Sequence, residues 1–519
     1  MVEEPPGDGP TPLADLVVAS EAVAATSSRL EKISIIAALL GRLGAAEIEP
    51  TVGYLTGAPR QGRVGVGWAT VAGLDRSGVR DQPRERLTIT DLDEAVDRLV
   101  EVTGTGSAAA RAALLGDLLA RSSAAEASFI SCVLTGELRQ GALVGLMAEA
   151  VAKAAGVPAA AVRRAHMLGG RLGPTAVLAL TGGEVALAGV GLEVLRPVQP
   201  MLAATATSLD VALEAMGMAS VEWKLDGARI QVHRIDDTVA VFTRNLRDVT
   251  SRLPEVVEAA LSLPVRSVVL DGETLTMDVE DRPRSFQDTM ARFGAEGPRQ
   301  ELLRPWFFDC LHVDGTDLLD QPLRARLQAL EEIAPTQRIP GVVTSDPQEA
   351  ARVQAEALGA GHEGVMVKAI DSVYRAGRRG QAWQKVKPVH SFDLVVLAAE
   401  WGSGRRRGWL SNLHLGARDP AGGFVMVGKT FKGLTDVVLA WQTAQFLERE
   451  TSRSGHHDEV VHVRPELVVE VALDGVQRSV RYPGGVALRF ARVVRYRNDK
   501  DPDQADTIDS LRAMLPGRP

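Results

Sequence analysis

The sequence has few cysteines, no long uncharged hydrophobic run and no excess of positive charge. Its 519 residues include only two cysteines, Cys132 and Cys310, which lie far apart in apolar surroundings. This excludes a disulfide framework and a zinc site built from cysteines, and it suits a reducing cytoplasm. No run of about 18 uncharged apolar residues is present, so we expect no transmembrane helix and no membrane partner. The formal net charge of −8 excludes a uniformly basic nucleic-acid binder but permits local basic patches.

The length and composition predict a bacterial, cytoplasmic protein of about three domains. Apolar residues make up 45% of the chain, which is enough for several hydrophobic cores. Residues 1–12 are acidic and rich in proline and glycine, and they lack the basic-then-apolar order of a signal peptide. We therefore expect a short disordered tail. The abundance of alanine, glycine and arginine and the scarcity of lysine are typical of a GC-rich bacterial genome.

Residues 13–200 have the pattern of a helical domain. Apolar residues recur close to every 3.6 positions in 28–43, and Thr90 predicts the start of another helix. Further alanine-rich helices are predicted at about 107–121, 124–134, 141–155 and 159–168. Between two of them, residues 135–141 place glycines beside Arg139 near a helix start, where exposed backbone amides suit a phosphate. An ordinary helix–helix turn is the alternative interpretation of this loop.

An extended segment containing Pro197 and Pro200 marks a domain boundary, after which residues 201–388 alternate between strand and helix patterns. Within this α+β region, Lys224 follows an apolar run and precedes an Asp-Gly pair and Arg229. The pair favours a tight turn because glycine reaches positive φ without steric cost. We therefore expect Lys224 on a strand–turn–strand unit, and a solvated hairpin lysine is the alternative for this motif taken alone.

Residues 389–519 predict a small β-barrel of the OB type. About five short strands and one helix in this length fit that architecture. The strands are expected at 392–399, 412–417, 424–430, 460–463 and 467–473, and the helix at about 434–450. The region closes with a basic run at 489–500.

Charged groups at predicted strand ends follow one another through the second half of the chain. They are Lys224 to Arg229, Arg244-Asn245, Asp271-Gly272-Glu273, Glu363 to Lys368 and Lys385-Val386-Lys387, followed by Arg497, Asp499 and Lys500. In this order and with this spacing, the chain resembles the ATP-dependent DNA ligases of bacterial and archaeal type, within the covalent nucleotidyltransferase superfamily. The resemblance covers about 195–510. The helical block, including the loop at Arg139, resembles that family's DNA-binding domain.

The resemblance implies a multidomain fold and a three-step reaction. The expected domains are an all-α DNA-binding domain (13–200), an α+β nucleotidyltransferase or adenylation domain (201–388) and a β-barrel OB-fold domain (389–519). By the family's chemistry, Lys224 attacks the α-phosphate of ATP and becomes lysyl-AMP. The AMP then passes to the 5′-phosphate at a nick, and the 3′-hydroxyl displaces it. Lys385 and Lys387 would disfavour the charged amine and neutralise charge growing on the phosphate.

The resemblance also implies ATP and Mg²⁺ as cofactors. Glu273 and Glu363 carry hard oxygen ligands that suit Mg²⁺, and Glu273 would contact the ribose as well. Either residue alone is as readily a turn carboxylate, and only their joint occurrence favours a metal. Asp499 and Lys500 resemble the pair that swings over the triphosphate in the first step and orients pyrophosphate. This implies that the C-terminal domain rotates between steps.

Around the base, the resemblance assigns Glu222 to the adenine. Phe308 would stack on one face of the base and Met366 would close the other. A shift of one residue turns a strand side chain to the opposite face of its sheet, so Phe307 and Val365 remain competing candidates.

Several arginines resemble residues that handle phosphates. Arg229, Arg244 and Arg379 resemble those that bind the ribose, the phosphates of ATP and the 5′-phosphate of DNA. The residues expected to contact DNA are Arg139, Arg244, Arg405 and Arg497, with a solvated loop as the alternative for Arg405. We expect a monomer that encircles nicked duplex DNA, contacts mainly its backbone, and acts in DNA repair, replication or recombination.

Two alternatives of different classes compete with this interpretation. An RNA ligase or a capping-type guanylyltransferase uses the same lysine chemistry, but the long helical block and the Asp499-Lys500 ending weigh against both. A non-catalytic clamp on DNA ends would not need Lys224, Glu273, Glu363, Lys385 and Lys387 all intact. The pair of histidines at 456–457 is interpreted as part of a loop rather than as a metal site.

Overall fold

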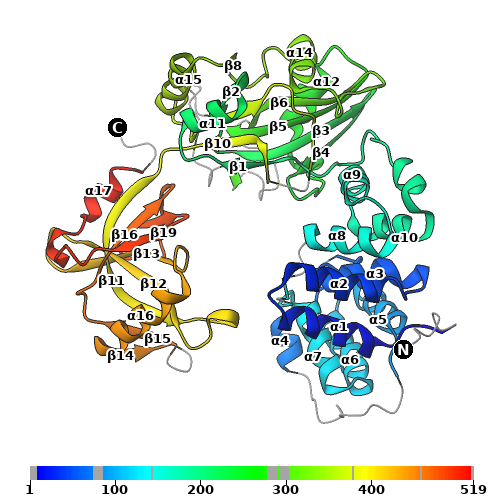
Figure 1. Cartoon of the computed structure of the whole chain (residues 1–519), viewed down its shortest axis with the longest axis horizontal. Coiled ribbons are helices and arrows are strands. Elements are labelled where there is room, and N and C mark those ends of the chain that lie inside the picture. The colour runs from blue at the N-terminus through cyan, green and yellow to red at the C-terminus, as the bar shows by residue number, and fades with distance from the viewer. Residues whose placement is uncertain are drawn as a thin grey trace.

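The chain forms three lobes arranged in a C shape (Figure 1). The computed structural model describes residues 9–62, 64–73, 86–138, 140–141, 144–277, 284, 289–290, 303–376, 379–455 and 459–515. We call the three parts the helical lobe (13–188), the two-sheet lobe (202–388) and the C-terminal lobe (390–515). The order of a helical region, a mixed-sheet region and an antiparallel region confirms the coarse fold prediction. The histidine pair at 456–457 lies outside the described residues.

The helical lobe is a bundle of short helices around one hydrophobic core. Its elements are α1 (Leu13–Ala25), α2 (Arg29–Leu40), α3 (Ala45–Thr56), α4 (Trp68–Ala72), α5 (Ile89–Glu101), α6 (Ser107–Arg121), α7 (Ala124–Thr135), α8 (Val144–Ala155), α9 (Ala159–Gly169) and α10 (Leu172–Ala188). Each buries one apolar stripe; α5, for example, buries Leu92, Val96 and Leu99.

Helix starts in this lobe follow from their capping residues. Thr88 accepts a hydrogen bond from the Asp91 amide at 3.1 Å, and the Asp91 carboxylate accepts one from the Thr88 amide at 2.8 Å. These two reciprocal bonds satisfy amides that the first helical turn leaves free. The helix therefore begins at Ile89, and the prediction that Thr90 caps it was wrong by two residues.

The first sheet of the two-sheet lobe has the order β1-β10-β9-β2-β8. Its strands are β1 (Leu202–Thr205), β2 (Ala219–Lys224), β8 (Gly341–Thr344), β9 (Gly364–Ala369) and β10 (Arg379–Val386). Only the β1–β10 pair is parallel. Helices α11 (Leu209–Met216) and α15 (Pro347–Gly359) cover its outer face and bury a small core of alanine, valine and leucine.

The second sheet is antiparallel and has the order β4-β3-β5-β6-β7. Its strands are β3 (Ala228–Ile235), β4 (Thr238–Thr243), β5 (Ser267–Thr276), β6 (Leu303–Val313) and β7 (Thr316–Asp317). Helices α12 (Pro254–Leu261) and α14 (Leu323–Ile333) cover its outer face. A third core, which contains Trp383 and Tyr374 on one side and Leu311 on the other, lies between the two sheets.

The strand–turn–strand unit predicted around Lys224 is present, but its two strands belong to different sheets. The strand that ends at Lys224 pairs only within the first sheet, whereas the strand that begins at Ala228 pairs within the second. The Asp-Gly pair therefore crosses from one sheet to the other. Gly227 does not adopt positive φ; a Cβ there would lie 2.5 Å from the Thr274 carbonyl oxygen, so close packing requires the glycine. Glu273, predicted at a strand end, lies inside β5.

The C-terminal lobe is an antiparallel sheet with a second layer of short strands. Its elements are β11 (His390–Trp401), β12 (Leu410–Arg418), β13 (Phe424–Thr430), α16 (Asp436–Glu448), β14 (Glu450–Ser454), β15 (Val460–Val463), β16 (Val468–Leu473), β17 (Gly475–Arg478), β18 (Val486–Arg489), β19 (Arg492–Tyr496) and α17 (Ile508–Arg512). Strand β11 pairs with β12 along one edge and with β15 and β16 along the other. Within the described residues no ladder joins β13 to β19, so a closed barrel is not shown.

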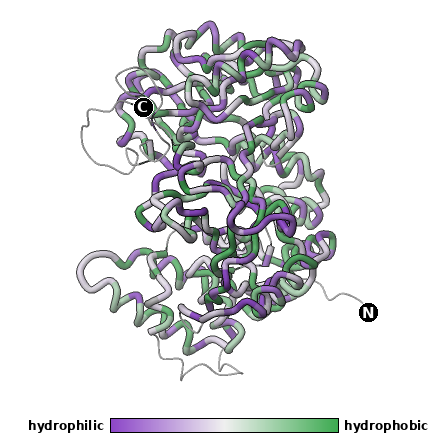
Figure 2. The backbone as a smooth tube through the Cα atoms, turned by 90° about the vertical axis from the view of Figure 1, so that its left-hand side faces the viewer, coloured by the Kyte–Doolittle hydropathy of each residue, from purple (hydrophilic) through white to green (hydrophobic). Residues whose placement is uncertain are grey.

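Side chains connect the lobes. Arg164 of α9 donates two hydrogen bonds to Asp320, at 2.8 and 2.7 Å, and Met167 packs into the core between the sheets. On the other side, Lys387 donates to Asp474 at 3.0 Å. In Figure 2, hydrophobic and hydrophilic residues interleave along the tube, as expected for elements that each bury one face. Among the described residues, no helix combines the length and the apolar character needed to cross a bilayer.

Candidate active site

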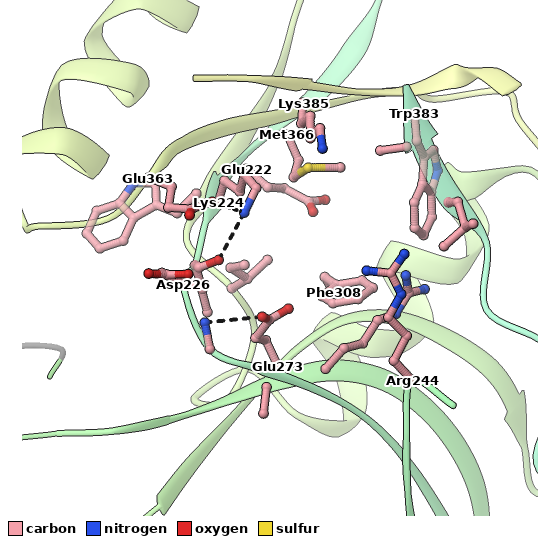
Figure 3. A pocket seen from close by; sticks show the side chains of 18 of the residues that line it. Glu222, Lys224, Asp226, Arg244, Glu273, Phe308, Glu363, Met366, Trp383 and Lys385 are labelled. Atoms are coloured by element: carbon pink, nitrogen blue, oxygen red, sulfur yellow. Dashed lines mark hydrogen bonds and ion pairs between the residues drawn. The ribbon is translucent and has the colours of Figure 1, made fainter. Parts of the chain in front are cut away.

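The two sheets enclose a cavity of about 690 Å³, a volume typical of small-ligand sites. Its lining comes from β1, β2, β9 and β10 of the first sheet, from β3, β4, β5 and β6 of the second, and from the loops after β2 and β4. The C-terminal lobe adds Arg489 and Phe490. Figure 3 shows Lys224, Glu222 and Glu273 extending into one shared space from both sheets.

Strand register explains why the side chains of the first sheet face the cavity together. Neighbouring strands pair so that two rows of side chains cross the sheet: Glu222, Met366 and Lys385, and next to them Lys368 and Trp383. Alternate residues point the other way, and Val365 is accordingly buried against the outer helices. Met366 lines the cavity and Val365 does not, so Met366 is the better candidate of that pair.

Lys224 ends β2 and stands opposite Gly364 in β9. Its Nζ forms an ion pair with Glu363 Oε2 and donates to its neighbour's carbonyl, Leu225 O, at 3.3 Å. Gly364 is needed here, because its φ is +136° and a Cβ would lie 2.3 Å from a β10 carbonyl oxygen. The nucleophile candidate is therefore held at a fixed place where three strands meet.

Three cationic side chains surround the Glu363 carboxylate. Besides Lys224, it pairs with Lys387 at 3.1 Å and lies 3.6 Å from the Arg489 guanidinium. Burial alone would raise the pKa of Glu363, but the two ammonium groups outweigh it and lower the pKa to about 2. The carboxylate is therefore ionised throughout the physiological range.

Glu273 behaves in the opposite way. Burial raises its pKa to about 7, although Lys224 and Arg229 both oppose the shift. Its Oε1 accepts a hydrogen bond from the Gly227 amide at 3.2 Å. One cavity thus holds two carboxylates whose surroundings move their pKa values apart.

The base-stacking candidates are separated by the pleat of β6. Phe307 is fully buried in the core beneath the second sheet, whereas Phe308 lines the cavity with 9% of its surface exposed. In Figure 3, Phe308 and Met366 lie on opposite sides of the central space. Phe308 lines the cavity and Phe307 does not, so Phe308 is the better candidate of the two phenylalanines.

Lys368 is a cavity residue to which the sequence analysis assigned no role. Its ammonium forms an ion pair with Glu222, and both side chains are almost completely buried. The same ammonium lies 4.4 Å from the ring centre of Phe308 and 4.5 Å from that of Trp383. Its position two residues after Met366 on one strand was the available signal, since residues two apart share a face.

Arg229 is anchored rather than free. It donates two hydrogen bonds to Asp271, at 2.9 and 2.6 Å, and a third to the Met201 carbonyl at 2.7 Å. Tyr374 donates to the same Asp271 at 2.7 Å. Arg229 still lines the cavity, so Asp271 and Tyr374 fix its direction.

The C-terminal lobe reaches the cavity through different residues from those expected. Arg489 donates two hydrogen bonds to Asp226, at 2.7 and 3.1 Å, and Phe490 follows it with φ of +55°. Asp499 and Lys500 do not line the cavity; Asp499 pairs with Arg497 at 2.7 Å, and Lys500 forms an ion pair with Asp393. Arg497 also pairs with Asp393 at 2.9 Å. Their predicted roles require another arrangement of this lobe.

Other predicted residues divide into three groups. Lys385 and Arg244 line the cavity, and Arg244 lines a second one as well. Arg379 begins β10 and Arg405 lies in a short 3-10 turn at Gly404–Arg406, but their side chains are outside the described part of the chain. Arg139 is also outside it.

The carboxylates present fit a magnesium ion. Glu273 and Glu363 line the same cavity and are oxygen donors. In the described parts of the chain, no cluster of three or more His, Cys, Asp or Glu residues is placed to hold a metal. Mg²⁺ suits such a sparse site, because it keeps several waters and takes further ligands from substrate phosphates.

Family comparisons identify the chain. Residues 200–387 match the ATP dependent DNA ligase domain, 406–500 the ATP dependent DNA ligase C terminal region, and 69–152 the DNA ligase N terminus. The chain belongs to the ATP-dependent DNA ligase family. This membership makes it an enzyme that uses ATP to form phosphodiester bonds, and it confirms the resemblance found in the sequence.

Full-length relatives agree with this family. A probable DNA ligase of Saccharopolyspora erythraea is 60% identical over 503 residues, which cover 97% of this chain and 98% of the relative. DNA ligase B of Mycobacterium tuberculosis is 54% identical, with 97% of this chain and 99% of the relative covered. A solved structure named Pmar-Lig_PreS3 is 19% identical and has a TM-score of 0.61, with 93% of this chain and 99% of that chain covered, so it is similar in fold.

Proposed function

We propose that this ligase seals nicks in duplex DNA through a covalent intermediate on Lys224. One observation carries the proposal: the Lys224 amine shares one cavity with Glu363, Lys387 and Glu273, and Phe308 and Met366 line the same cavity. A ligase needs this combination, because the same site must bind a purine, hold phosphates and present a nucleophile.

In the first step, Nζ of Lys224 forms a bond to the α-phosphorus of ATP, and the bond to pyrophosphate breaks. Attack requires a neutral amine, and in this structure the amine is held in contact with Glu363. The Lys224 proton must therefore leave as this ion pair loosens. Lys385 and Lys387 line the same cavity and supply positive charge for the phosphate oxygens.

In the second step, AMP passes from Lys224 to the 5′-phosphate at the nick. In the third, the neighbouring 3′-hydroxyl attacks that phosphate and releases AMP, which completes the phosphodiester bond. Arg244 borders the nucleotide cavity without an acidic partner among the described residues, so it is available to hold the incoming phosphate.

Adenine would lie between Phe308 and Met366, with Glu222 at its edge. The Glu222 carboxylate extends into the cavity in Figure 3, where it can accept a hydrogen bond from the exocyclic amine of adenine. Guanine presents a carbonyl at that position, which would face a carboxylate without a proton between them. This favours ATP over GTP.

Magnesium would be held by Glu273 and Glu363, and when bound it would neutralise phosphate charge in the transition state. The ionised Glu363 is ready to act as a ligand. Glu273, whose pKa burial raises to about 7, would lose its proton more readily beside a dication.

The DNA is expected to lie within the C formed by the three lobes (Figure 1). We propose the domain limits 1–12, 13–200, 201–388 and 389–519, with the last as an OB-fold. A single chain would encircle the nicked duplex as a monomer, and Arg139, Arg405 and Arg497 would contact its phosphates. The C-terminal lobe would turn to bring Asp499 and Lys500 over ATP in the first step. We place the protein in the bacterial cytoplasm.

Labelled ATP tests the proposal. The protein is incubated with Mg²⁺ and ATP labelled at the α-phosphate, and the label retained after denaturation is measured before and after adding nicked duplex DNA. We expect covalent label that nicked DNA removes, and Lys224→Ala should reduce labelling by at least about a thousandfold. A clamp would take up no label, and a capping-type enzyme would prefer labelled GTP. Either result would refute the proposal.

A further inference from the structure

A second cavity, of about 590 Å³, lies where the helical lobe meets the two-sheet lobe. Its walls come from α3, α8, α9 and α10 on one side and from the start of β1 and the loop after β4 on the other. It shares Leu202, Arg244 and Asn245 with the nucleotide cavity. The two cavities are therefore neighbours, with Arg244 bordering both.

The lining of this cavity is strongly cationic. Four arginines line it, Arg60, Arg163, Arg171 and Arg244, against one acidic residue, Glu49. Arg60 pairs with Asp93 at 2.7 Å, and Arg171 pairs with Glu49 at 2.8 Å. Arg163 and Arg244 have no hydrogen-bond or ion-pair partner within the described parts of the chain. Two guanidinium groups are thus left to attract an anion.

A buried imidazole adds an independent sign of a ligand. His166 lines the cavity with only 8% of its surface exposed, and its Nδ1 has no hydrogen-bond partner among the described residues. A buried polar atom without a partner costs free energy unless something satisfies it. Burial lowers the pKa of His166, so the ring is neutral at pH 7 and its two nitrogens comprise one donor and one acceptor.

We propose that this second cavity binds a backbone phosphate of the DNA close to the nick, held by Arg163, Arg244 and His166. The inference rests on the proposed function, because it takes DNA as the ligand. A phosphodiester chain fits better than a small free anion: the cavity adjoins the nucleotide cavity at Arg244, and a DNA strand carries one charge per about 3.4 Å along its axis.

The site would also align the two lobes. Arg163 and His166 belong to α9 of the helical lobe, whereas Arg244 belongs to the two-sheet lobe. One phosphate held between them would fix the helical lobe on the strand whose end reacts. Such a contact positions the DNA and carries no sequence information.

Binding of a nicked duplex tests this without requiring catalysis. The affinity of the full-length protein is measured by fluorescence anisotropy at several salt concentrations. Arg163→Gln should weaken binding about tenfold and reduce the slope of log K against log salt by about 0.9, the value for one lost phosphate contact. His166→Phe keeps the ring volume and removes the nitrogens, so it should weaken binding by a smaller factor with little change in slope.

The matched control is Arg164→Gln. Arg164 follows Arg163 on the same helix, is exposed and lines neither cavity. It should change the affinity by less than about twofold, because an exposed ion pair contributes little. If Arg163→Gln and Arg164→Gln have equal effects, the loss reflects general charge and the proposed site is wrong.

Neutral phosphates locate the contact. Duplexes are made with one methylphosphonate at each of several positions on either side of the nick, in either strand. When the methylphosphonate replaces the phosphate that Arg163 contacts, the wild type should bind the duplex more weakly. Arg163→Gln should not lower the affinity for that duplex any further. A full additional loss at every position would overturn the site. These outcomes do not depend on ATP labelling. If the proposed function is wrong, the protein takes up no covalent label from ATP. If this inference is wrong, Arg163→Gln weakens binding equally on every methylphosphonate duplex.

Discussion

The two sides of the nucleotide cavity are built differently. On the sheet side, Glu222, Lys224 and Met366 are fixed by strand ladders and by a buried ion pair to Lys368. On the C-terminal side, Arg489 and Phe490 arrive from another lobe, and side-chain contacts such as Arg489–Asp226 attach them. Ladder hydrogen bonds persist unless the lobe unfolds, whereas a few side-chain contacts can break and reform. The difference indicates that the sheets form the nucleotide site in advance and that the C-terminal lobe closes it reversibly. We call the part contributed by Arg489 and Phe490 the removable side.

Among the variants of the sheet side, Lys368→Met is expected to have the largest effect on stability. This change keeps the length of the side chain but leaves Glu222 charged and buried without its partner. We expect a loss of roughly 3–5 kcal/mol in the free energy of unfolding, measured by urea denaturation. The double variant Lys368→Met/Glu222→Gln removes both charges and should recover much of that loss. If the single variant is as stable as the wild type, the sheet side is less rigid than we propose.

Neighbouring phenylalanines on β6 sharpen the distinction between scaffold and binding site. Phe307→Ala should cost roughly 3–5 kcal/mol of stability, because Phe307 is fully buried in the core beneath the sheet. Phe308→Ala should mainly raise the KM for ATP, by about tenfold, since base stacking contributes about 1–3 kcal/mol. Denaturation and the rate of Lys224 labelling measure the two effects. A reversal of the two phenotypes would mean that the base lies elsewhere.

The sheet side was partly predictable from sequence because strand alternation is local. Residues two apart share a face, so the sequence alone groups Glu222 with Lys224, and Met366 with Lys368. What alternation could not show was the pairing of strands. The Asp-Gly pair after Lys224 predicted a tight turn between two strands, but the chain crosses between sheets there, and close packing against β5 explains Gly227.

The C-terminal side was less predictable because its contacts join residues far apart in sequence. Asp226 and Arg489 are 263 positions apart, and no periodicity relates them. The family resemblance directed attention to Asp499 and Lys500, which in this arrangement pair within their own lobe. A sequence describes one chain but not which of several lobe arrangements it adopts.

Glu273→Gln tests the sheet side through pH. The folded-state pKa of about 7 lies above the ordinary value of 4.5, so Glu273 is neutral in both states at low pH. As pH rises from about 4.5 to 7, only the unfolded state ionises freely, and the wild type loses stability. The variant should match the wild type near pH 4.5 and exceed it by on the order of 2 kcal/mol at pH 8. Urea denaturation across this range measures the difference, and a constant difference would contradict the shifted pKa.

The smallest effect on stability is expected on the removable side. Arg489→Gln takes away both hydrogen bonds to Asp226 but disturbs no ladder, so the free energy of unfolding should change by less than about 0.5 kcal/mol. The C-terminal lobe should nevertheless move away more often, because a charged contact of this kind is worth about 1–3 kcal/mol. Small-angle X-ray scattering should then show a larger radius of gyration.

Arg495→Gln is the control for this release, since Arg495 pairs with Glu470 at 2.7 Å inside the C-terminal lobe. Its loss removes the same charge from the same lobe without touching the two-sheet lobe, so the radius of gyration should not change. Equal expansion in both variants would show that general charge, and not the Asp226 contact, holds the lobe in place. Expansion in Arg489→Gln alone, with unchanged stability, would show that the C-terminal side of the cavity is removable while the sheet side remains intact.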